Sequence, residues 1–175
     1  MTNGGGLDAH LSLKADAMAA AGRALESGDA ARQTITAECS ASDLTGVRRM
    51  RIREFQIVSD SGPAFGGSSL GPSSPELLLA VLASCLTHTY LIGAAMRGVS
   101  LDGVHVRFEA ENNDAAFLGL DTADPSYPFN IRAVVRIESR ASAEEIAALH
   151  AYASRACPLT TLVREAHPVD IRAIA

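Results

Sequence analysis

The segment "PSSPELLLAVLASCLTHTY" (Pro72–Tyr90) places a cysteine in the middle of the most apolar part of the chain. Ser74 can cap a helix, Pro75 suits its first turn, and Glu76 suits the positive end of the helix dipole. A glycine follows the last residue of the run and is a typical C-terminal stop. The pattern therefore predicts a helix over about Pro75–Arg97 with the cysteine near its centre.

Residues 77–96 carry no formal charge, and about 20 apolar residues can span a bilayer. A membrane span is disfavoured, because Ser84, Thr87, His88 and Thr89 put polar groups where lipid penalises them. We expect instead a helix that is buried on nearly every side. The sheet of so small a chain covers one face of such a helix, and the remaining apolar surface predicts a second copy of the chain. The expected assembly is a homodimer with its central helices between two sheets.

The other patterns predict alternating helices and antiparallel strands. In one strand the residues Arg53–Glu54 interrupt the apolar alternation, which predicts a bulge. Ser142 and Glu145 match a capping box at the start of a helix that stops before Pro158. In the first strand, Thr34–Cys39, the residues Ile35, Ala37 and Cys39 are expected to form a half-buried face. The other expected strands are Val47–Val58, Val104–Glu111, Ile131–Glu138 and 169–175. Besides the central helix, the expected helices are Leu7–Leu25, Ser142–Cys157 and 158–166. This order is typical of an α+β fold in which antiparallel sheets wrap around long central helices.

The composition is that of an ordinary globular protein. Its 175 residues are 47% apolar and 20% charged, with a net charge of −5. The length suits a main domain, residues 31–175, after an N-terminal helical extension, residues 1–30. No block of Lys and Arg is present, which disfavours a nucleic-acid partner. Three cysteines and no signal sequence at the N-terminus favour a reducing, cytoplasmic location.

The thiol of Cys85 has two interpretations. A free cysteine in a core is ordinarily a small apolar residue. A reactive thiol instead needs cations or hydrogen-bond donors nearby, and a second cysteine that can take up the oxidised sulfur as a disulfide. Cys157 is the candidate partner, because a helix stopped by Pro158 can point its thiol inward, whereas Cys39 is expected to be structural. His88, one helical turn from Cys85, is either a local donor or base or an ordinary core histidine.

Metal binding is the rival chemistry for these residues. Cys85-x-x-His88 resembles half of a zinc site, but a complete site needs three or four ligands. The sequence contains no second pair with such spacing. No metal and no other cofactor are therefore predicted.

Four stretches of the chain, in this order, resemble the OsmC/Ohr superfamily: "GGSSLGPSSPELLLAVLASCL", "MRGVSLDGVHVRFEAE", "FLGLD" and "CPLTTL". The resemblance covers about Arg49–Ala175. It implies an intertwined α+β homodimer and, as in many members, a thiol peroxidase that reduces organic hydroperoxides at the dimer interface. On the matching positions, Cys85 would be the peroxidatic cysteine and Cys157 the resolving one. An external dithiol, lipoyl-linked in some relatives, would then regenerate the enzyme.

The sequence departs from the peroxidase pattern of that family in one respect. Well-characterised peroxidases carry a Glu ten positions before the reactive cysteine and an Arg that pairs with both. Here Pro75 stands ten positions before Cys85 and Glu76 stands nine before it, an offset that rotates a helical side chain by about 100°. Arg53, on the preceding strand, is the candidate arginine. Glu76, Arg53 and His88 are thus auxiliary candidates, in a pattern closer to an OsmC-like branch in which the second cysteine is not always present.

Residues and resemblance together predict a cytoplasmic, cofactor-free thiol peroxidase for organic hydroperoxides, with no membrane or nucleic-acid partner. The rival hypothesis is a non-catalytic dimer that binds a small apolar or electrophilic ligand between its central helices. A lowered pKa of the Cys85 thiol would favour the enzyme, whereas a normal or raised pKa would favour the binder. A metal-binding module is the third alternative.

Overall fold

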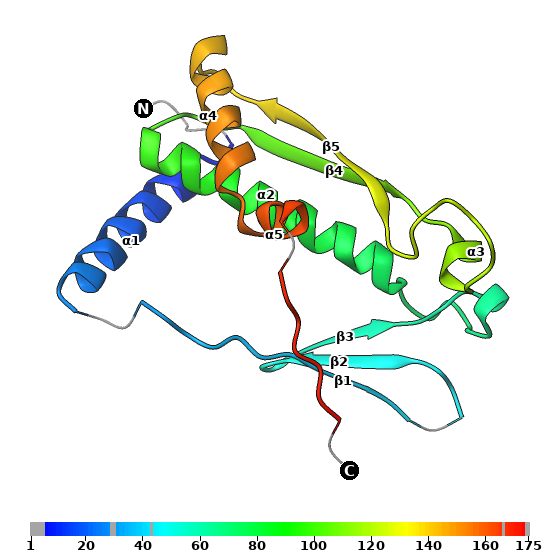
Figure 1. Ribbon diagram of the computed structural model, residues 1–175. Coiled ribbons are helices and arrows are strands. Elements are labelled where there is room, and N and C mark those ends of the chain that lie inside the picture. The colour runs from blue at the N-terminus through cyan, green and yellow to red at the C-terminus, as the bar shows by residue number, and fades with distance from the viewer. Residues whose placement is uncertain (1–5, 29–30, 43, 166, 174–175) are drawn as a thin grey trace. The chain divides into compact units, whose positions relative to one another are not determined.

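The computed structural model describes residues 6–28, 31–42, 44–165 and 167–173, and Figure 1 labels its elements. The chain divides into two compact units. The first contains residues up to 20, residues 82–108 and residues from 132 onward, and the second contains residues 21–81 and 109–131. The mixture of helices with antiparallel sheets confirms the predicted α+β class.

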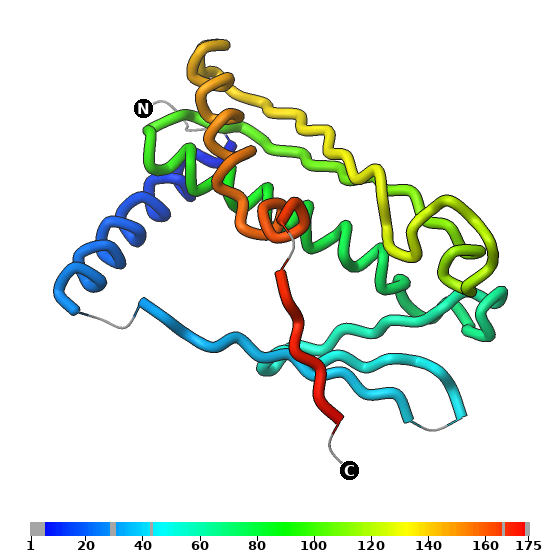
Figure 2. Tube along the Cα trace, in the orientation of Figure 1, coloured from blue at the N-terminus to red at the C-terminus, as the bar shows by residue number. Residues whose placement is uncertain are grey.

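The long elements lie within a few residues of their predicted positions. The β4 and β5 strands pair with each other, and the trace in Figure 2 follows them side by side in opposite directions. The elements are α1 (Asp8–Glu26), β1 (Glu38–Ala41), β2 (Arg48–Ile52), β3 (Phe55–Ser59), a 3₁₀ turn (Pro63–Phe65), α2 (Ser74–Arg97), β4 (Gly103–Glu111), α3 (Asp114–Phe117), β5 (Phe129–Glu138), α4 (Ala143–Ala156) and α5 (Pro158–Arg164).

Helix α2 begins with a reciprocal cap. The backbone N–H of Ser73 donates to the Glu76 carboxylate at 2.7 Å, and the N–H of Glu76 faces the Ser73 hydroxyl at 3.5 Å. The cap is therefore Ser73, one residue earlier than the predicted Ser74, and Pro75 takes the second helical position. The hydroxyl and N–H of Ser73 lower the pKa of Glu76, as expected for a carboxylate in a capping box.

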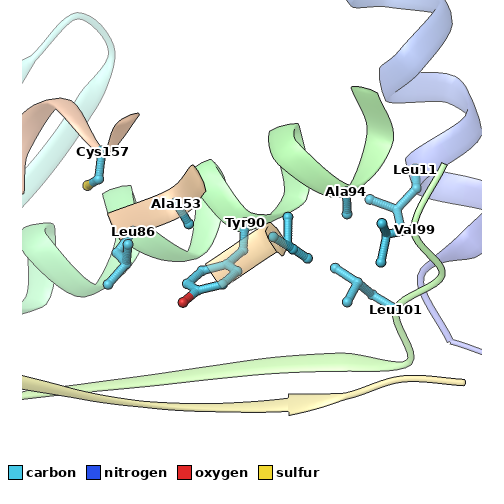
Figure 3. Packing of buried hydrophobic residues seen from close by; sticks show 9 residues of the cluster. Leu11, Leu86, Tyr90, Ala94, Val99, Leu101, Ala153 and Cys157 are labelled. Carbon is cyan, nitrogen blue, oxygen red and sulfur yellow. The ribbon is translucent and has the colours of Figure 1, made fainter. Parts of the chain in front are cut away.

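The core of the first unit forms where α4 crosses the buried stripe of α2 (Figure 3). Tyr90 and Leu149 are both 0% exposed, at the centre of a cluster of nine buried residues. Gly93 permits the close approach, because a Cβ atom at this position would lie 2.6 Å from Cδ1 of Tyr152. The buried residues of this cluster are Leu11, Leu86, Tyr90, Ala94, Val99, Leu101, Leu149, Ala153 and Cys157.

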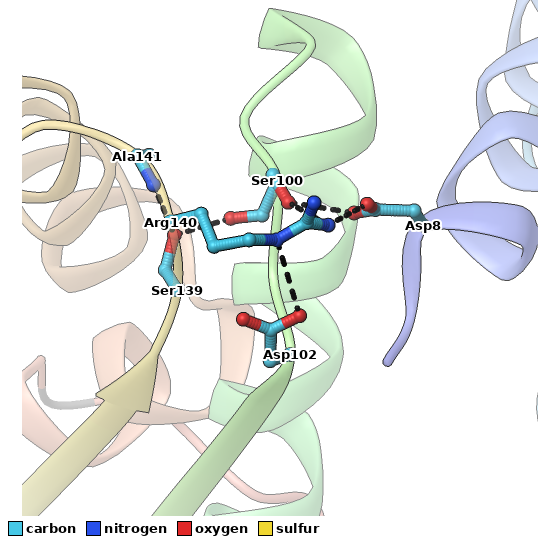
Figure 4. Close-up of polar contacts among 6 residues, drawn as sticks. All are labelled: Asp8, Ser100, Asp102, Ser139, Arg140 and Ala141. Atoms are coloured by element: carbon cyan, nitrogen blue, oxygen red, sulfur yellow. Dashed lines mark hydrogen bonds and ion pairs between the residues drawn. The ribbon is translucent and has the colours of Figure 1, made fainter. Parts of the chain in front are cut away.

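The N-terminal end of α1 is tied to this unit by polar contacts (Figure 4). The Asp8 carboxylate accepts a hydrogen bond from the Ser100 hydroxyl at 2.8 Å and pairs with the guanidinium of Arg140. Arg140 also lies 3.6 Å from the Asp102 carboxylate. The Ser100 hydrogen bond and the charge of Arg140 outweigh partial burial and lower the pKa of Asp8. These contacts fix where α1 starts against the core.

The second unit contains the antiparallel sheet β1-β2-β3. The predicted bulge at Arg53–Glu54 is wrong. These two residues form the turn of a hairpin in which Ile52 pairs with Phe55, and Arg53 has a positive φ of 54°. A two-residue turn reverses the chain and moves the apolar positions to the other phase of the alternation, which produces the same sequence pattern as a bulge.

Two further predictions, for the first strand and for the C-terminal strand, are also wrong. The first strand begins at Glu38 rather than Thr34, and Ile35 and Cys39 are exposed rather than half-buried. The reason is that the described residues cover neither face of β1, whose four residues are all exposed. Of the predicted strand 169–175, residues 169–173 form no strand, and residues 174–175 lie outside the described residues. Val169 and Ile171 are more than three-quarters exposed, and a strand needs a neighbour to accept its hydrogen bonds.

Helix α2 is less covered than the sequence predicted. The single chain buries one stripe of it, while Val81 is 47% and Met96 61% exposed. By length and composition the helix could cross a membrane. Core helices of soluble proteins share those properties, and the packing of the buried stripe into the cluster of Figure 3 supports a core helix.

Candidate functional site

The first unit brings the two sulfurs of Cys85 and Cys157 together. Cys85 lies in the middle of α2, and Cys157 lies at the junction of α4 and α5. Their Sγ atoms are 3.6 Å apart, and no disulfide joins them. A disulfide has an S–S bond of about 2.05 Å. On oxidation of the pair, a small movement of either side chain would therefore be enough to close the bond.

The junction between two helices explains the position of Cys157. Its N–H closes the last turn of α4 on Ala153, and its carbonyl accepts from Thr161 in the first turn of α5, both at 3.1 Å. Pro158 cannot continue α4, because it has no N–H and its ring excludes the helical conformation of the residue before it. Cys157 takes an extended conformation instead and its side chain is 0% exposed, whereas Cys85 is partly exposed.

The surroundings of the two thiols shift their pKa values in opposite directions. Burial raises the pKa of Cys85 and the neighbouring Cys157 adds to the rise, against a smaller opposing effect of the Leu159 N–H. Burial also acts to raise the pKa of Cys157, but hydrogen bonds from the hydroxyl and N–H of Thr160, from Cys85 and from Thr89 outweigh it, so this pKa is lowered. The reduced pair therefore places negative charge on Cys157 more readily than on Cys85.

Two threonines beside the sulfurs were missed by the sequence analysis. Thr89 is 5% exposed, and its hydroxyl donates to the carbonyl of Cys85 at 2.9 Å, one helical turn back. Thr160 lies three residues after Cys157 in the first turn of α5. Thr89 stands four residues after Cys85, and this helical spacing could have predicted its contact with Cys85. The contact of Thr160 depended on knowing that α5 begins at Pro158.

His88 contacts α1 rather than the thiols. Its Nε2 lies 3.2 Å from Nζ of Lys14, and the side chain is exposed. An ammonium group has only donors, so Lys14 is the donor in this contact. The core alternative for His88 is thus wrong, and its role as a local donor or base stays a prediction.

Glu76 and Arg53 belong to the second unit, and each has a local contact that accounts for its position. Glu76 is held by Ser73 in the cap of α2. The guanidinium of Arg53 lies 5.2 Å above the ring of Phe55. On an ideal helix, nine residues amount to about 2.5 turns. The side chains of Glu76 and Cys85 therefore leave the backbone on opposite sides of α2. An auxiliary role of either residue stays a prediction.

Within the residues that the structure describes, no group of three or more His, Cys, Asp or Glu side chains could hold a metal ion. Cys85 and His88 therefore contribute to no such cluster there. The arrangement of the site is that of a dithiol pair in an apolar surrounding.

A family model described as OsmC-like protein matches residues 66–172. The match covers more than half of the chain and includes both cysteines of the pair. The protein belongs to the OsmC-like family. No curated protein sequence matches the chain.

Solved structures with low sequence identity share the fold. An OsmC-like protein from Mycoplasma pneumoniae has a TM-score of 0.64 and 17% identity over 75% of this chain and 88% of its own. An organic hydroperoxide resistance protein OsmC from Legionella pneumophila has a TM-score of 0.55 and 19% identity, over 77% and 92%. An OsmC-like protein of unknown function from Vibrio cholerae has a TM-score of 0.57 and 11% identity, over 74% and 93%. At these identities the likeness establishes the fold.

Proposed function

We propose that this protein is a thiol peroxidase that reduces organic hydroperoxides through Cys85 and Cys157. The observation that carries the proposal is the 3.6 Å separation of the two sulfurs, one partly accessible and one fully buried. An accessible thiol can meet a peroxide, and a neighbouring thiol can trap the oxidised product before further oxidation. The name of the solved Legionella pneumophila relative points to the same chemistry.

The reaction balances with a dithiol as the reductant. The Cys85 sulfur attacks one peroxide oxygen, the O–O bond breaks, and the alcohol leaves as Cys85 becomes a sulfenic acid. Cys157 then attacks the Cys85 sulfur, forms the disulfide and releases water. An external dithiol, such as a lipoyl group, reduces the disulfide by exchange and restores both thiols. No cofactor takes part.

The surroundings of Cys85 favour an apolar peroxide. The residue packs against the buried hydrophobic cluster, beside residues such as Leu86. Transfer of an apolar substituent from water into such surroundings is favourable by about 25 cal/mol per Å², and hydrogen peroxide carries no such substituent. We therefore propose organic hydroperoxides as the substrate class, in a cytoplasmic homodimer.

Peroxide turnover tests the proposal. Consumption of cumene hydroperoxide and of hydrogen peroxide would be followed with dihydrolipoamide as the reductant. The organic peroxide should be consumed faster, Cys85→Ser should abolish turnover, and Cys157→Ser should abolish or greatly slow it. Cys39→Ser is the matched control and should retain the wild-type rate. Failure of the wild-type protein to consume either peroxide would reject the proposal.

The raised pKa of Cys85 favours a second candidate. In that case the protein binds a small apolar or electrophilic ligand without catalysis, and the cysteines are packing or scavenging groups. The two functions differ in stoichiometry. A binder or scavenger would consume at most one equivalent of an electrophile per Cys85, whereas an enzyme would consume many equivalents of peroxide in the presence of dithiol.

A further inference from the structure

The second unit contains a cavity that the proposed chemistry of the two sulfurs does not use. Its volume is about 580 Å³, and all of its lining residues belong to this unit. Strand β2, the 3₁₀ turn, the first turn of α2 and helix α3 each contribute to its wall. Cavities of this size commonly hold small molecules. The side chains in the wall indicate which kind of molecule fits.

Among the described residues that line the cavity, Arg48 carries the one positive charge. Its Nη2 donates to the Ser59 hydroxyl at 3.1 Å, and its Nη1 donates to the Ser61 hydroxyl at 3.3 Å. Nη1 also lies 3.5 Å from the Gly46 carbonyl. A guanidinium has five N–H donors. The Nε donor is buried and has no acceptor among the residues that the structure describes, and one N–H of Nη2 is left over beside it.

The two unused donors form one edge of the Arg48 guanidinium. A buried donor without an acceptor carries a penalty, and a ligand that supplies the acceptor removes it. A carboxylate matches this edge, because its two coplanar oxygens can accept from both N–H groups at once. Arg48 is half-buried, so water screens its charge less than it would at an exposed arginine.

Two acidic residues lie near this arginine, and neither takes up its free edge. Asp114 lines the same cavity, but it is exposed to water, and its carboxylate accepts from the Asn112 amide at 3.1 Å. The carboxylate oxygens of buried Asp60 are held by three backbone N–H groups, and the charge of Arg48 is the smallest cause of its lowered pKa. The free edge of Arg48 therefore still favours an anion.

Two phenylalanines provide an apolar part of the same wall. The rings of Phe65 and Phe117 meet edge to face, with their centroids 6.0 Å apart, and they remain 44% and 65% exposed. Phe65 lies in the loop that the N–H groups bound to Asp60 hold in place. Phe117 ends helix α3, which begins at a side-chain cap from Asn113. Exposed aromatic rings in fixed positions favour contact with another flat apolar group.

We propose that this cavity binds a small aromatic carboxylic acid, with its carboxylate on the free edge of Arg48 and its ring against Phe65 and Phe117. A carboxylate fits better than a phosphate, because one guanidinium balances one negative charge and pairs with two coplanar oxygens. This binding site goes beyond the peroxidase function proposed above and does not rest on it.

Titration of the wild-type protein with phenylacetate tests the proposal, with the backbone amide signals followed by NMR. We expect saturable shifts of amides around the cavity, such as those of Gly62 and Asn112, with a dissociation constant of about 1 mM for a ligand of about ten non-hydrogen atoms. Phenylacetamide lacks the charge and acetate lacks the ring, so both should bind at least roughly tenfold more weakly. Phenyl phosphate should also bind more weakly than phenylacetate.

Variants of the wall separate the two parts of the site. Arg48→Gln should weaken phenylacetate roughly 10- to 100-fold, the range for lost hydrogen bonds to a charged group, and leave phenylacetamide unchanged. Arg48→Lys keeps the charge but cannot pair through two donors of one edge, so its effect should be intermediate. Phe117→Ala should weaken the acid and the amide alike. Arg51→Gln, at an exposed position on the other face of β2, is the matched control and should bind as wild type does.

The spectra of the variants also report whether the fold is retained. Selective loss of the acid in Arg48→Gln, with phenylacetamide binding and the wild-type spectrum kept, supports the proposal. A wild-type protein without saturable shifts at tenfold the expected dissociation constant would overturn it. Equal affinity for the acid and the amide, tighter binding of phenyl phosphate, or an equal loss in Arg51→Gln would overturn it as well. Because no peroxide is involved, failure of the peroxidase function would leave these results unchanged.

Discussion

The surroundings of Cys85 disfavour the ionisation of its thiol. Its pKa is raised by burial, and the neighbouring Cys157 adds to the rise. The pair behaves differently, because the sulfur 3.6 Å away lies where Thr160 supplies donors. The ionisation of either thiol therefore depends on the state of the other.

Gly93 sets the distance between α2 and α4. A Cβ atom there would lie 2.6 Å from Cδ1 of Tyr152 and 2.8 Å from Cδ1 of Leu149. We expect Gly93→Ala to lower the free energy of unfolding by about 1–3 kcal/mol, because the packed side chains must shift. Urea denaturation measures the change.

Gly22 is the matched control for this substitution. It lies within α1, and a Cβ atom there would meet nothing within 4 Å. Gly22→Ala should therefore stabilise the protein by up to about 1 kcal/mol, since Ala is the better helix former. Equal effects of the two substitutions would contradict the role given to Gly93.

At the scale of elements, the loop before α2 is organised around a buried carboxylate. Asp60 is 2% exposed and accepts N–H donors from Ser61, Ser68 and Leu70 at 2.8, 2.9 and 3.1 Å. These hydrogen bonds, that of Leu70 first, lower the pKa of Asp60 below its ordinary value of 3.8. The charged form of the carboxylate therefore holds the loop that leads into the cap of α2.

The lowered pKa of Asp60 has a consequence for stability as a function of pH. A carboxyl whose pKa is lower in the folded state stabilises the protein above its unfolded pKa, and this contribution is lost as the pH falls through the folded pKa. We expect Asp60→Asn to destabilise the protein most near neutral pH. The difference from wild type should shrink as the pH falls below about 4.

Denaturant unfolding at several pH values measures this difference. Exposed Asp121 is the control, and Asp121→Asn should leave the stability close to wild type throughout. A difference for Asp60→Asn that stays constant down to acidic pH would contradict the role given to its charge.

At the scale of the whole molecule, the single chain leaves apolar surface on its central helix. Val81 on α2 is 47% exposed, and Val169 and Ile171 in the C-terminal segment are exposed as well. Such surface is typical of an interface between subunits. We expect the protein to sediment as a homodimer, and Val81→Asp to weaken the dimer by placing a charge in that interface.

Analytical ultracentrifugation over a range of concentrations measures the association. Val81→Ala keeps the position apolar and serves as the control, so it should remain dimeric. A wild-type protein that is monomeric at all concentrations would contradict the dimer, and the uncovered face of α2 would then need another explanation.

The sequence predicted the parts of the fold that depend on local pattern. The uncharged run and the capping signals indicated α2, and the Ser142–Glu145 capping box indicated α4, which the structure confirms. The errors concern contacts that the local sequence does not contain. Cys39 looked like core because its strand alternates, but both faces of that strand are exposed. Residues 169–173 form no strand with any of the residues that the structure describes.

The sequence predicted the two cysteines of the candidate site but not the residues that surround them. The pairing of Cys85 with Cys157 was expected from the resemblance and from the stop at Pro158. The contribution of Thr160 was missed, and so was its contact with Arg164. Both depend on the start of α5 and on the side-chain positions within it, which the local sequence does not determine.

The most direct test of the central claim is mass spectrometry of the reduced protein after one equivalent of cumene hydroperoxide. Peptide mapping should find a disulfide between Cys85 and Cys157, formed rapidly and absent from Cys85→Ser. Cys39 should remain a free thiol. Unchanged thiols, or a disulfide that involves Cys39, would contradict the assignment of the sulfur pair as the reacting centre.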